Sequence, residues 1–223
     1  MVRNFQFLSV VAAAGAFALM AWVPLAVAED IRGDVYTLDT CSVSGEKLGS
    51  MGDPIVQVHE GREIRFCCAG CPDIFEKDPA QYIAKIDAQM IAQQKAHYPL
   101  EIGVVSGEAF DGTAIDRIVG NRLVRFSSEN YASTFDASPA KYLAKLDAAV
   151  VAKQTADYPF DVCMVSGEKF AEGKSFDMVV ANRLVKLCCE MCVEQVNKRP
   201  ARFLSMLLNR SLDAEVAEGS DHK

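Results

Sequence analysis

Histidine and tryptophan are scarce in this chain of 223 residues, which contains three histidines and one tryptophan. Three histidines provide few side chains for general acid–base catalysis near neutral pH. The sequence also lacks a nucleophile elbow, a phosphate-binding loop and a histidine-rich hydrolase motif. We therefore expect a protein that is not an enzyme.

Stretches of basic residues are missing as well. The chain has 23 Lys and Arg against 30 Asp and Glu, a formal net charge of −7 at pH 7. Because nucleic acids and anionic membrane surfaces attract clustered positive charge, this composition argues against both as partners. Simple solubility explains the acidity.

The N-terminal segment carries one early positive charge, Arg3, and no charge from Phe7 to Ala28. It ends on Ala26-Val27-Ala28, which has the A-x-A form of a signal-peptidase site. We expect residues 1–28 to be a signal peptide and the mature protein to be periplasmic or secreted, without membrane contact after cleavage. An uncleaved anchor is the alternative, because the apolar stretch is long enough to span a bilayer.

One unit of about 60 residues occurs three times, as is typical of repeat architectures. The tetrapeptide Val-Ser-Gly-Glu begins at Val43, Val105 and Val165, which are 62 and 60 residues apart. The chain after the signal is accordingly divided into module 1 (29–97), a degenerate module 2 (98–157), module 3 (158–216) and a polar tail (217–223).

Each unit is predicted to be a small α+β module, a β-hairpin followed by a helix. Residues 55–59 and 63–67 form two short apolar runs around a turn at Glu60-Gly61. The other copies have Asn121 and Asn182 in this turn, and asparagine tolerates the left-handed conformation that tight turns require.

The helix of each unit is predicted from its start signal and its apolar spacing. Asp78 and Ser138 are good N-cap residues and each precedes a proline, whereas Arg199 in the third copy predicts a less sharp start. Apolar side chains recur every four residues after the cap, forming a stripe toward the hairpin. In module 1 this stripe is Tyr82, Ile86 and Met90, and in module 2 it is Tyr142, Leu146 and Val150.

The cysteines occur in two sets of four and are absent from the middle copy. Module 1 has Cys41, Cys67, Cys68 and Cys71; module 3 has Cys163, Cys188, Cys189 and Cys192; module 2 has Gly103, Ser127, Ser128 and Tyr131 at these places. Residues that are lost as a group are expected to work as a group. Because module 2 keeps its turn and stripe without thiols, the two cysteine sets are expected to serve function rather than folding alone.

One interpretation of each set is a metal site. Cys41 precedes a turn, Cys67 ends a strand, and Cys71 begins a helical turn whose N-terminus should lower the thiol pKa. Thiolates bind Zn²⁺ in a tetrahedron of four ligands and Cu(I) with fewer. Neighbours on a strand point to opposite faces, so Cys68 joins Cys67 on one ion only if the backbone turns between them.

The competing interpretation is disulfide chemistry, since an exported protein lives where disulfides persist. Cys68-x-x-Cys71 and Cys189-x-x-Cys192 have the spacing of a thiol oxidoreductase pair. A periplasmic thiol–disulfide redox protein and a disulfide-braced binding scaffold both remain open. No alternation of strands and helices of the thioredoxin kind surrounds these pairs.

Module 1 resembles the YHS and TRASH family of heavy-metal-binding modules. The likeness lies in Cys41 with Gly45, Phe66-Cys67-Cys68-Ala69-Gly70-Cys71, Phe75, and Asp78-Pro79-Ala80-Gln81-Tyr82. The match is weaker in module 3, which has Leu187, Val196 and Arg199 at three of these positions. Cys68 and Cys189 stand where the family often has serine.

The resemblance implies a treble-clef-like module that binds copper, zinc or related ions in sensing, trafficking or resistance. Carried over residue by residue, the implied ligands are Cys41, Cys67 and Cys71 in module 1, and Cys163, Cys188 and Cys192 in module 3. The implied partners are the metal ion and a metal transporter or another exported protein.

Three further residues are weaker candidates. His59 lies at the hairpin turn, but module 3 has a valine there, so a structural role is expected. Met164 and Met191 flank cysteines of module 3 and have soft sulfurs, although methionine is more often a core filler.

Overall fold

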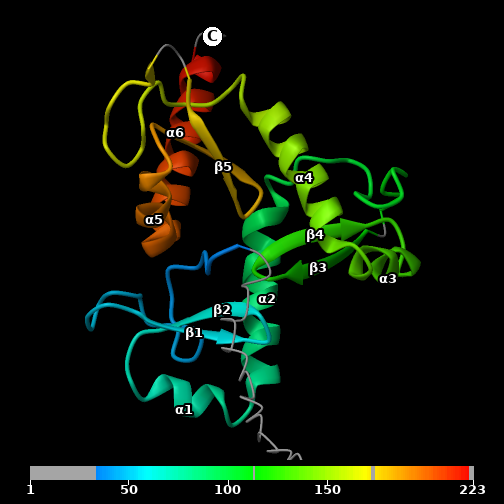
Figure 1. The fold of residues 1–223 in the computed structure, drawn as a ribbon, viewed down its shortest axis with the longest axis vertical. Coiled ribbons are helices and arrows are strands. Elements are labelled where there is room, and N and C mark those ends of the chain that lie inside the picture. Colours follow the sequence, from blue (N-terminus) through cyan, green and yellow to red (C-terminus); the bar gives the residue numbers. More distant parts are fainter. Residues whose placement is uncertain (1–33, 113, 172–173, 221–223) are drawn as a thin grey trace, which may run out of the picture.

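The computed structural model describes residues 34–112, 114–171 and 174–220, with side chains through Arg210 (Figure 1). The expected signal peptide lies outside these residues. The elements are β1 (Ile55–His59), β2 (Arg62–Phe66), α1 (Cys71–Phe75), α2 (Pro79–Lys95), β3 (Ile115–Val119), β4 (Arg122–Phe126), α3 (Asn130–Asp136), α4 (Pro139–Gln154), β5 (Phe176–Val180), β6 (Arg183–Leu187), α5 (Met191–Lys198) and α6 (Pro200–Ser220). One arrangement, a hairpin followed by a short and a long helix, is therefore repeated three times, and the predicted α+β class is confirmed.

Each hairpin is a separate two-stranded antiparallel sheet. Both central residues of every turn have positive φ, for example 70° at Asn121 and 61° at Asn182. This is the type I′ geometry whose twist matches that of the strands. The second strand of module 1 begins and ends one residue earlier than predicted, so Cys67 lies just beyond it.

The long helices begin where the sequence predicts. The Asp78 carboxylate accepts a hydrogen bond from the Gln81 N–H at 3.2 Å, whereas the Ser138 side chain makes no capping bond. The expectation of a less sharp start in module 3 is wrong, because Arg199 has nearly the same backbone angles as Asp78 and Ser138 and α6 begins at Pro200. Helix α6 continues through Ser220, so the expected tail is helical over its first four residues.

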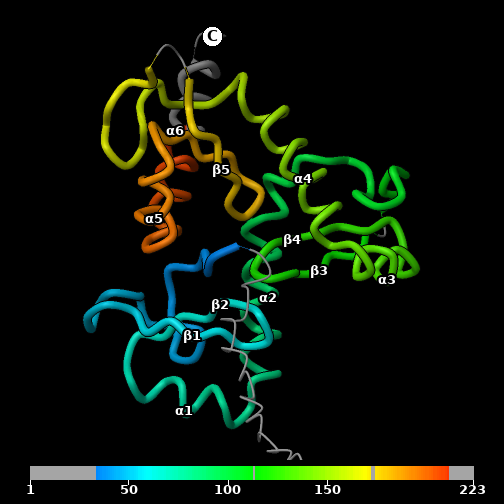
Figure 2. The backbone as a smooth tube through the Cα atoms, viewed as in Figure 1, coloured from blue at the N-terminus to red at the C-terminus, as the bar shows by residue number. Residues whose placement is uncertain are grey.

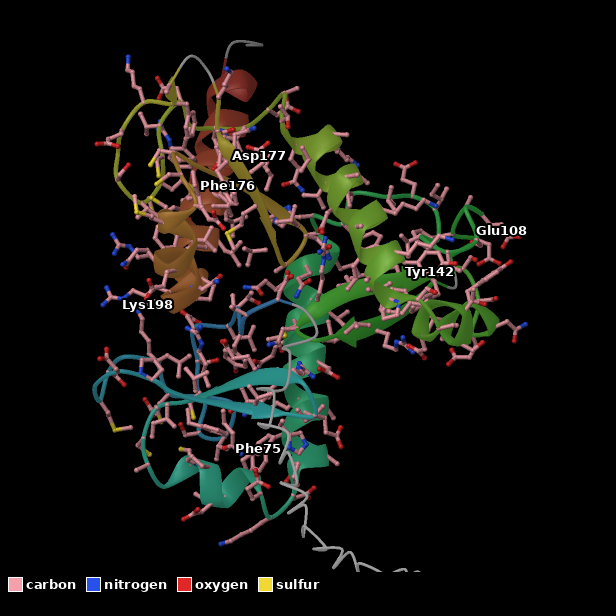
Figure 3. All side chains as sticks on the ribbon, viewed as in Figure 1. Phe75, Glu108, Tyr142, Phe176, Asp177 and Lys198 are labelled. Atoms are coloured by element: carbon pink, nitrogen blue, oxygen red, sulfur yellow. The ribbon has the colours of Figure 1, made fainter. Side chains whose placement is uncertain are left out.

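The predicted stripe is buried in each core, at Ile86 and Met90 and at Leu146 and Val150. In modules 1 and 2 the tyrosine of the stripe also ends a row of three aromatic rings, which we call the aromatic ladder. The ladder is Phe66, Phe75 and Tyr82 in module 1, with ring centroids 5.5 and 6.0 Å apart, and Phe126, Phe135 and Tyr142 in module 2, at 5.6 and 5.9 Å. Figure 3 labels one ladder residue of each module, Phe75 and Tyr142. Module 3 has Leu187, Val196 and Phe203 at these positions.

Neighbouring modules share their long helices, because α2 also packs on β3 and β4, and α4 on β5 and β6 (Figure 1). At the first junction the buried Asn121 side chain accepts from Arg62 Nε at 2.6 Å and donates to the Glu63 carbonyl at 2.8 Å. Gln94 donates to the Asn121 carbonyl and accepts from the Leu123 N–H, both at 2.8 Å.

The same hydrogen bonds recur at the second junction. Asn182 accepts from Arg122 Nε at 2.9 Å and donates to the Leu123 carbonyl at 3.0 Å. Gln154 donates to the Asn182 carbonyl at 2.9 Å and accepts from the Leu184 N–H at 2.8 Å. We call this set of contacts the junction network.

An ion pair completes the network at both places, since Arg62 pairs with Asp87 and Arg122 with Asp147, each at 2.5 Å. Its turn asparagine and its helix aspartate occur only where two modules meet. Module 1 has Gly61 in place of the turn asparagine, and module 3 has Leu208 in place of the helix aspartate. The network is thus specific to the two junctions.

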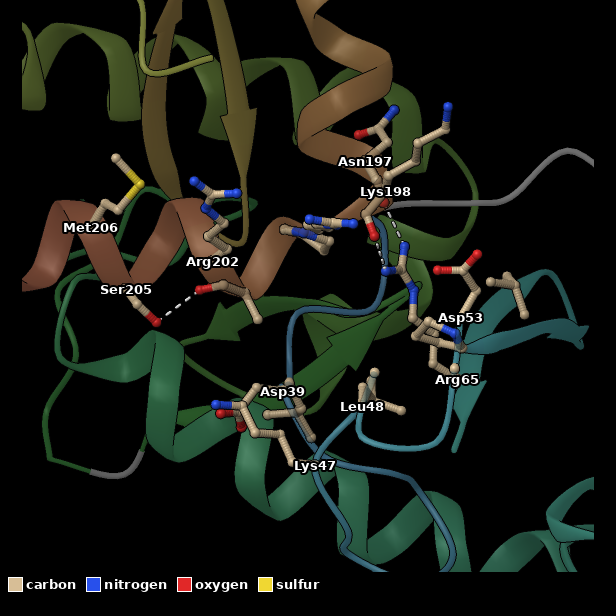
Figure 4. Close-up of a pocket in the computed structure, with 18 of the residues that line it drawn as sticks. Asp39, Lys47, Leu48, Asp53, Arg65, Asn197, Lys198, Arg202, Ser205 and Met206 are labelled. Atoms are coloured by element: carbon tan, nitrogen blue, oxygen red, sulfur yellow. Dashed lines mark hydrogen bonds between the residues drawn. The ribbon is translucent and has the colours of Figure 1, made fainter. Parts of the chain in front are cut away.

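Modules 1 and 3 also touch each other. The segment that begins at Asp34, blue in Figure 2, carries Val35 into the core of module 3, and the Asp34 carboxylate accepts the Ala181 N–H. Arg65 donates to the carbonyls of Asn197 and Lys198 at the end of α5, at 2.5 and 2.8 Å (Figure 4). The three modules therefore form a closed cluster.

A groove of about 1380 Å³ separates the loop before β1 from α5 and α6 (Figure 4). Among the residues that the structure describes, no helix has both the length and the apolar character needed to cross a membrane.

Candidate metal centre

The first wall of each site is a tight loop that begins at a cysteine. In module 1 an isolated strand-like pair, Thr40 with Lys47, closes the loop, and the Cys41 N–H donates to the Glu46 carbonyl at 2.7 Å. Gly45 turns the chain with φ of 76°, a conformation that favours glycine. Module 3 repeats this loop, with the Cys163 N–H on the Glu168 carbonyl at 2.8 Å.

The second wall is the bend between the hairpin and the short helix. Strand β2 ends at Phe66 and α1 begins at Cys71, where the Cys71 N–H donates to the Cys68 carbonyl at 3.2 Å. The backbone turns within this bend, so the alternation of a strand does not extend to Cys67 and Cys68. A backbone turn between Cys67 and Cys68, which we set as the condition for both to bind one ion, is therefore present.

In module 1 the thiols converge on Cys71. Its Sγ lies 3.7 Å from Cys41 Sγ, 3.8 Å from Cys67 Sγ and 3.5 Å from Cys68 Sγ. The Sγ atoms of Cys41, Cys67 and Cys71 all lie within 4.8 Å of one another and are all buried. We call this set cluster 1.

In module 3 the corresponding centre is Cys192. Its Sγ lies 3.8 Å from Cys163 Sγ, 3.6 Å from Cys188 Sγ and 3.9 Å from Cys189 Sγ. Cys163, Cys188 and Cys192 form the mutually close set, which we call cluster 3. Cys189 also lies 3.7 Å from Cys188.

All eight cysteines are free thiols. A zinc–thiolate bond is about 2.3 Å long, so the sulfurs of a zinc tetrahedron lie about 3.8 Å apart. The separations from Cys71 and Cys192, 3.5 to 3.9 Å, fall around this value. Two cysteine clusters are therefore positioned closely enough to bind a metal ion.

Cys68 and Cys189 differ from the other cysteines. Each touches the centre of its cluster but lies outside the mutually close set of three, and each is partly exposed. Of the eight predicted ligands, six are therefore brought together in two groups of three, and these two lie beside them.

The electrostatics favour a thiolate at the first cysteine of each set. Burial raises the pKa of the Cys41 thiol, but hydrogen bonds from the Ser44 hydroxyl and from backbone N–H groups outweigh it and lower the pKa to about 6. The same balance around Ser166 lowers the pKa of Cys163 to about 6. Hydrogen bonds to the charged form stabilise it.

The other cluster members keep their protons more firmly. Burial, with the neighbouring sulfurs, raises the pKa of Cys71 and of Cys192. The Ser44 hydroxyl lowers the pKa of Cys67, but burial and the Cys41 sulfur outweigh it and raise that pKa overall. The expectation that the helix start lowers the pKa of Cys71 is therefore wrong, because desolvation dominates there.

Module 2 shows what replaces the thiols. The Ser106 and Ser127 hydroxyls lie 2.8 Å apart, and Glu108 accepts from Ser127 at 3.3 Å and from Tyr131 at 3.2 Å. A Cβ on Gly103 would lie only 2.8 Å from Ser106 Oγ. A hydroxyl network has taken the space of the cysteine cluster.

The sequence analysis missed the serine of the repeated Val-Ser-Gly-Glu. Ser44 Oγ lies 3.3 Å from Cys67 Sγ, and Ser166 Oγ lies 3.5 Å from Cys188 Sγ. Both serines also lower the pKa of the first cysteine of their set. The repetition of this serine in all three copies was the sequence signal that could have singled it out.

The weaker candidates lie outside the clusters. The His59 ring packs edge-on against Phe75 with centroids 5.1 Å apart, as its expected structural role requires. Met164 Sδ accepts a hydrogen bond from the Tyr158 hydroxyl at 3.1 Å. Met191 is 83% exposed.

Comparisons of the chain with protein-family models, with curated proteins and with solved structures gave no match. The likeness to YHS and TRASH modules accordingly rests on the quoted residues alone.

Proposed function

We propose that this is an exported, non-enzymatic protein that holds one Zn²⁺ or Cu(I) ion in each of its two cysteine clusters, for heavy-metal trafficking, storage or resistance. Each outer unit is treated as a treble-clef-like module in which a loop and a helix start supply the thiolates. Module 2 serves as a spacer or an interaction surface.

One observation carries the proposal: a single sulfur, that of Cys71 or Cys192, contacts three others at similar distances. A cysteine in a disulfide has one sulfur partner at about 2.05 Å. Three sulfurs that all lie within 4.8 Å of one another, with a fourth beside them, instead fit coordination of one ion. The hydrogen bonds of Ser44 and Ser166 supply the outer interactions that typically orient metal ligands.

The test is metal loading of the reduced mature protein followed by native mass spectrometry. We expect two bound ions, with one lost in Cys71→Ser, the other lost in Cys192→Ser, and both lost in the double variant. Tyr131→Phe, at the equivalent place in module 2, is the matched control and should retain both ions. Absence of metal binding in the parent would refute the proposal.

A thiol–disulfide redox protein is the second candidate, and one observation favours it. Cys68 Sγ lies 3.5 Å from Cys71 Sγ, and hydrogen bonds from Cys71 and from the Gly70 N–H lower the pKa of Cys68 while burial raises that of Cys71. A partly exposed thiolate beside a buried thiol suits thiol exchange. This function predicts reduction of insulin disulfides and a native mass lower by two hydrogens per disulfide.

A further inference from the structure

The two clusters differ in their exposure to solvent. In cluster 1, Cys41, Cys67 and Cys71 are only 2%, 3% and 4% exposed. In cluster 3, Cys163 and Cys192 are buried, but Cys188 is partly exposed. An external ligand can therefore reach a member of the close set in module 3, whereas module 1 offers only Cys68 at its edge.

The side chains that pack against the two clusters differ as well. In module 1, Phe66 and Phe75 of the aromatic ladder belong to the same buried core as the thiols, and the His59 ring packs edge-on against Phe75. Module 3 has Leu187 and Val196 in place of the two phenylalanines. Smaller aliphatic side chains make fewer contacts than these edge-to-face rings, so they resist rearrangement of the ligands less.

The rims of the two sites differ as well. Met191 directly precedes Cys192 and projects into solvent, while the equivalent residue of module 1 is Gly70. A thioether is a soft ligand that suits Cu(I) better than Zn²⁺. Met191 thus gives module 3 an exposed soft group next to Cys192 in the sequence, which module 1 does not have.

From these three differences we propose that cluster 3 is the exchange site and cluster 1 the retention site, which rests on the metal-binding function proposed above. The acceptor or donor is a thiol-bearing molecule that approaches on the side of Cys188 and Met191. Each incoming thiol loses a proton to solvent as its sulfur binds the ion, and the released Cys188 and Cys192 thiolates each take up a proton from solvent. No electron is transferred.

The direct test uses the parent protein loaded with Zn²⁺ and an excess of a chromophoric zinc chelator. We expect release in two phases, with rates that differ by at least about tenfold, the size of effect that outer-shell changes have on metal sites. A pulse of N-ethylmaleimide after the fast phase, followed by peptide mass mapping, should label Cys188 and Cys192 while Cys67 and Cys71 stay protected.

Variants check the assignment independently. Cys67→Ser with Cys71→Ser should leave only the fast phase, and Cys188→Ser with Cys192→Ser only the slow one. A single rate for both ions, or early labelling of cluster 1, would overturn the inference although the metal-binding function stands. Failure of the parent to load any Zn²⁺ would instead refute that function.

The role of Met191 is tested with Cu(I). Met191→Leu should slow transfer of Cu(I) from cluster 3 to a competing thiol several-fold and leave Zn²⁺ release unchanged. The control is Met51→Leu, an exposed methionine of module 1 that has no cysteine next to it in the sequence. Equal Cu(I) transfer by the parent and Met191→Leu would show that the thioether takes no part.

Discussion

Replacement of Asn121 tests whether the junction network holds modules 1 and 2 together. Asn121→Gly keeps a residue suited to the positive φ of 70° but removes both side-chain hydrogen bonds. The bond from Arg62 Nε is charge-assisted and contributes about 1.5–3 kcal/mol, and the bond to the Glu63 carbonyl about 0.5–1.5 kcal/mol. Arg62 keeps its ion pair with Asp87, so its charge remains partnered.

We therefore expect Asn121→Gly to lower the free energy of unfolding by about 3 kcal/mol. Asn121→Ala should lower it by about 1 kcal/mol more, because a side chain with a Cβ is strained in the left-handed region. The difference between these two variants isolates the backbone contribution from the hydrogen bonds.

The assay is urea unfolding of the reduced, metal-free protein, with the melting temperature as a second measure. A loss of 3 kcal/mol corresponds to a shift of roughly 6–12 °C for a domain of this size. Asn130→Ala, which changes an exposed asparagine at the start of α3, is the control and should stay within about 0.5 kcal/mol of the parent. If Asn121→Gly also stays within that range, the junction network does not stabilise the array.

Three other measurements follow from the structure. Gly103→Ala should lower the free energy of unfolding in urea by about 1–3 kcal/mol, because its Cβ would crowd Ser106. Gly70→Ala, which has open space around it, should change this free energy by less than about 0.5 kcal/mol. Equal effects of the two variants would contradict the crowding. Binding of Zn²⁺ at pH 7.5 should release about two protons per ion, because Cys41 with its pKa of about 6 is already ionised. As the pH falls through 6 this thiolate protonates, so the number of protons released per ion should rise toward about three and the affinity for Zn²⁺ should fall. Calorimetry in buffers of different ionisation enthalpy measures the number of protons released. Release of three protons at pH 7.5 would contradict the lowered pKa. Arg65→Lys cannot reproduce the two-pronged donation to the end of α5 and should move modules 1 and 3 apart, seen as a larger radius of gyration in X-ray scattering; an unchanged radius would show that this bridge is dispensable.

The features of the fold that the sequence predicts correctly are local. The hairpins follow from short apolar runs around Glu60-Gly61 and its equivalents, and the helices from a proline after the cap and a four-residue apolar spacing. Convergence of the thiols could also be predicted, since a hairpin returns the chain to its starting point.

The features that escape prediction depend on contacts between modules. Asn121 is recognisable as a turn residue, but its side chain acts on Arg62 of the preceding module. Gln94 and Asp87 look like the polar face of an amphipathic helix and are instead partners of the next module or of Arg62. Likewise, the raised pKa of Cys71 depends on burial that only the folded cluster creates.

The junction network also bears on how the spacing between the two thiol sites is set. Module 2 carries the residues for both sides of the junction network, a turn asparagine at one end and the helix residues Asp147 and Gln154 at the other. Module 1 has only the helix half and module 3 only the turn half. A second copy of module 2 could therefore be inserted next to the first with the same junction contacts at each boundary. The insertion would increase the distance between clusters 1 and 3 and would break the contact of Arg65 with α5.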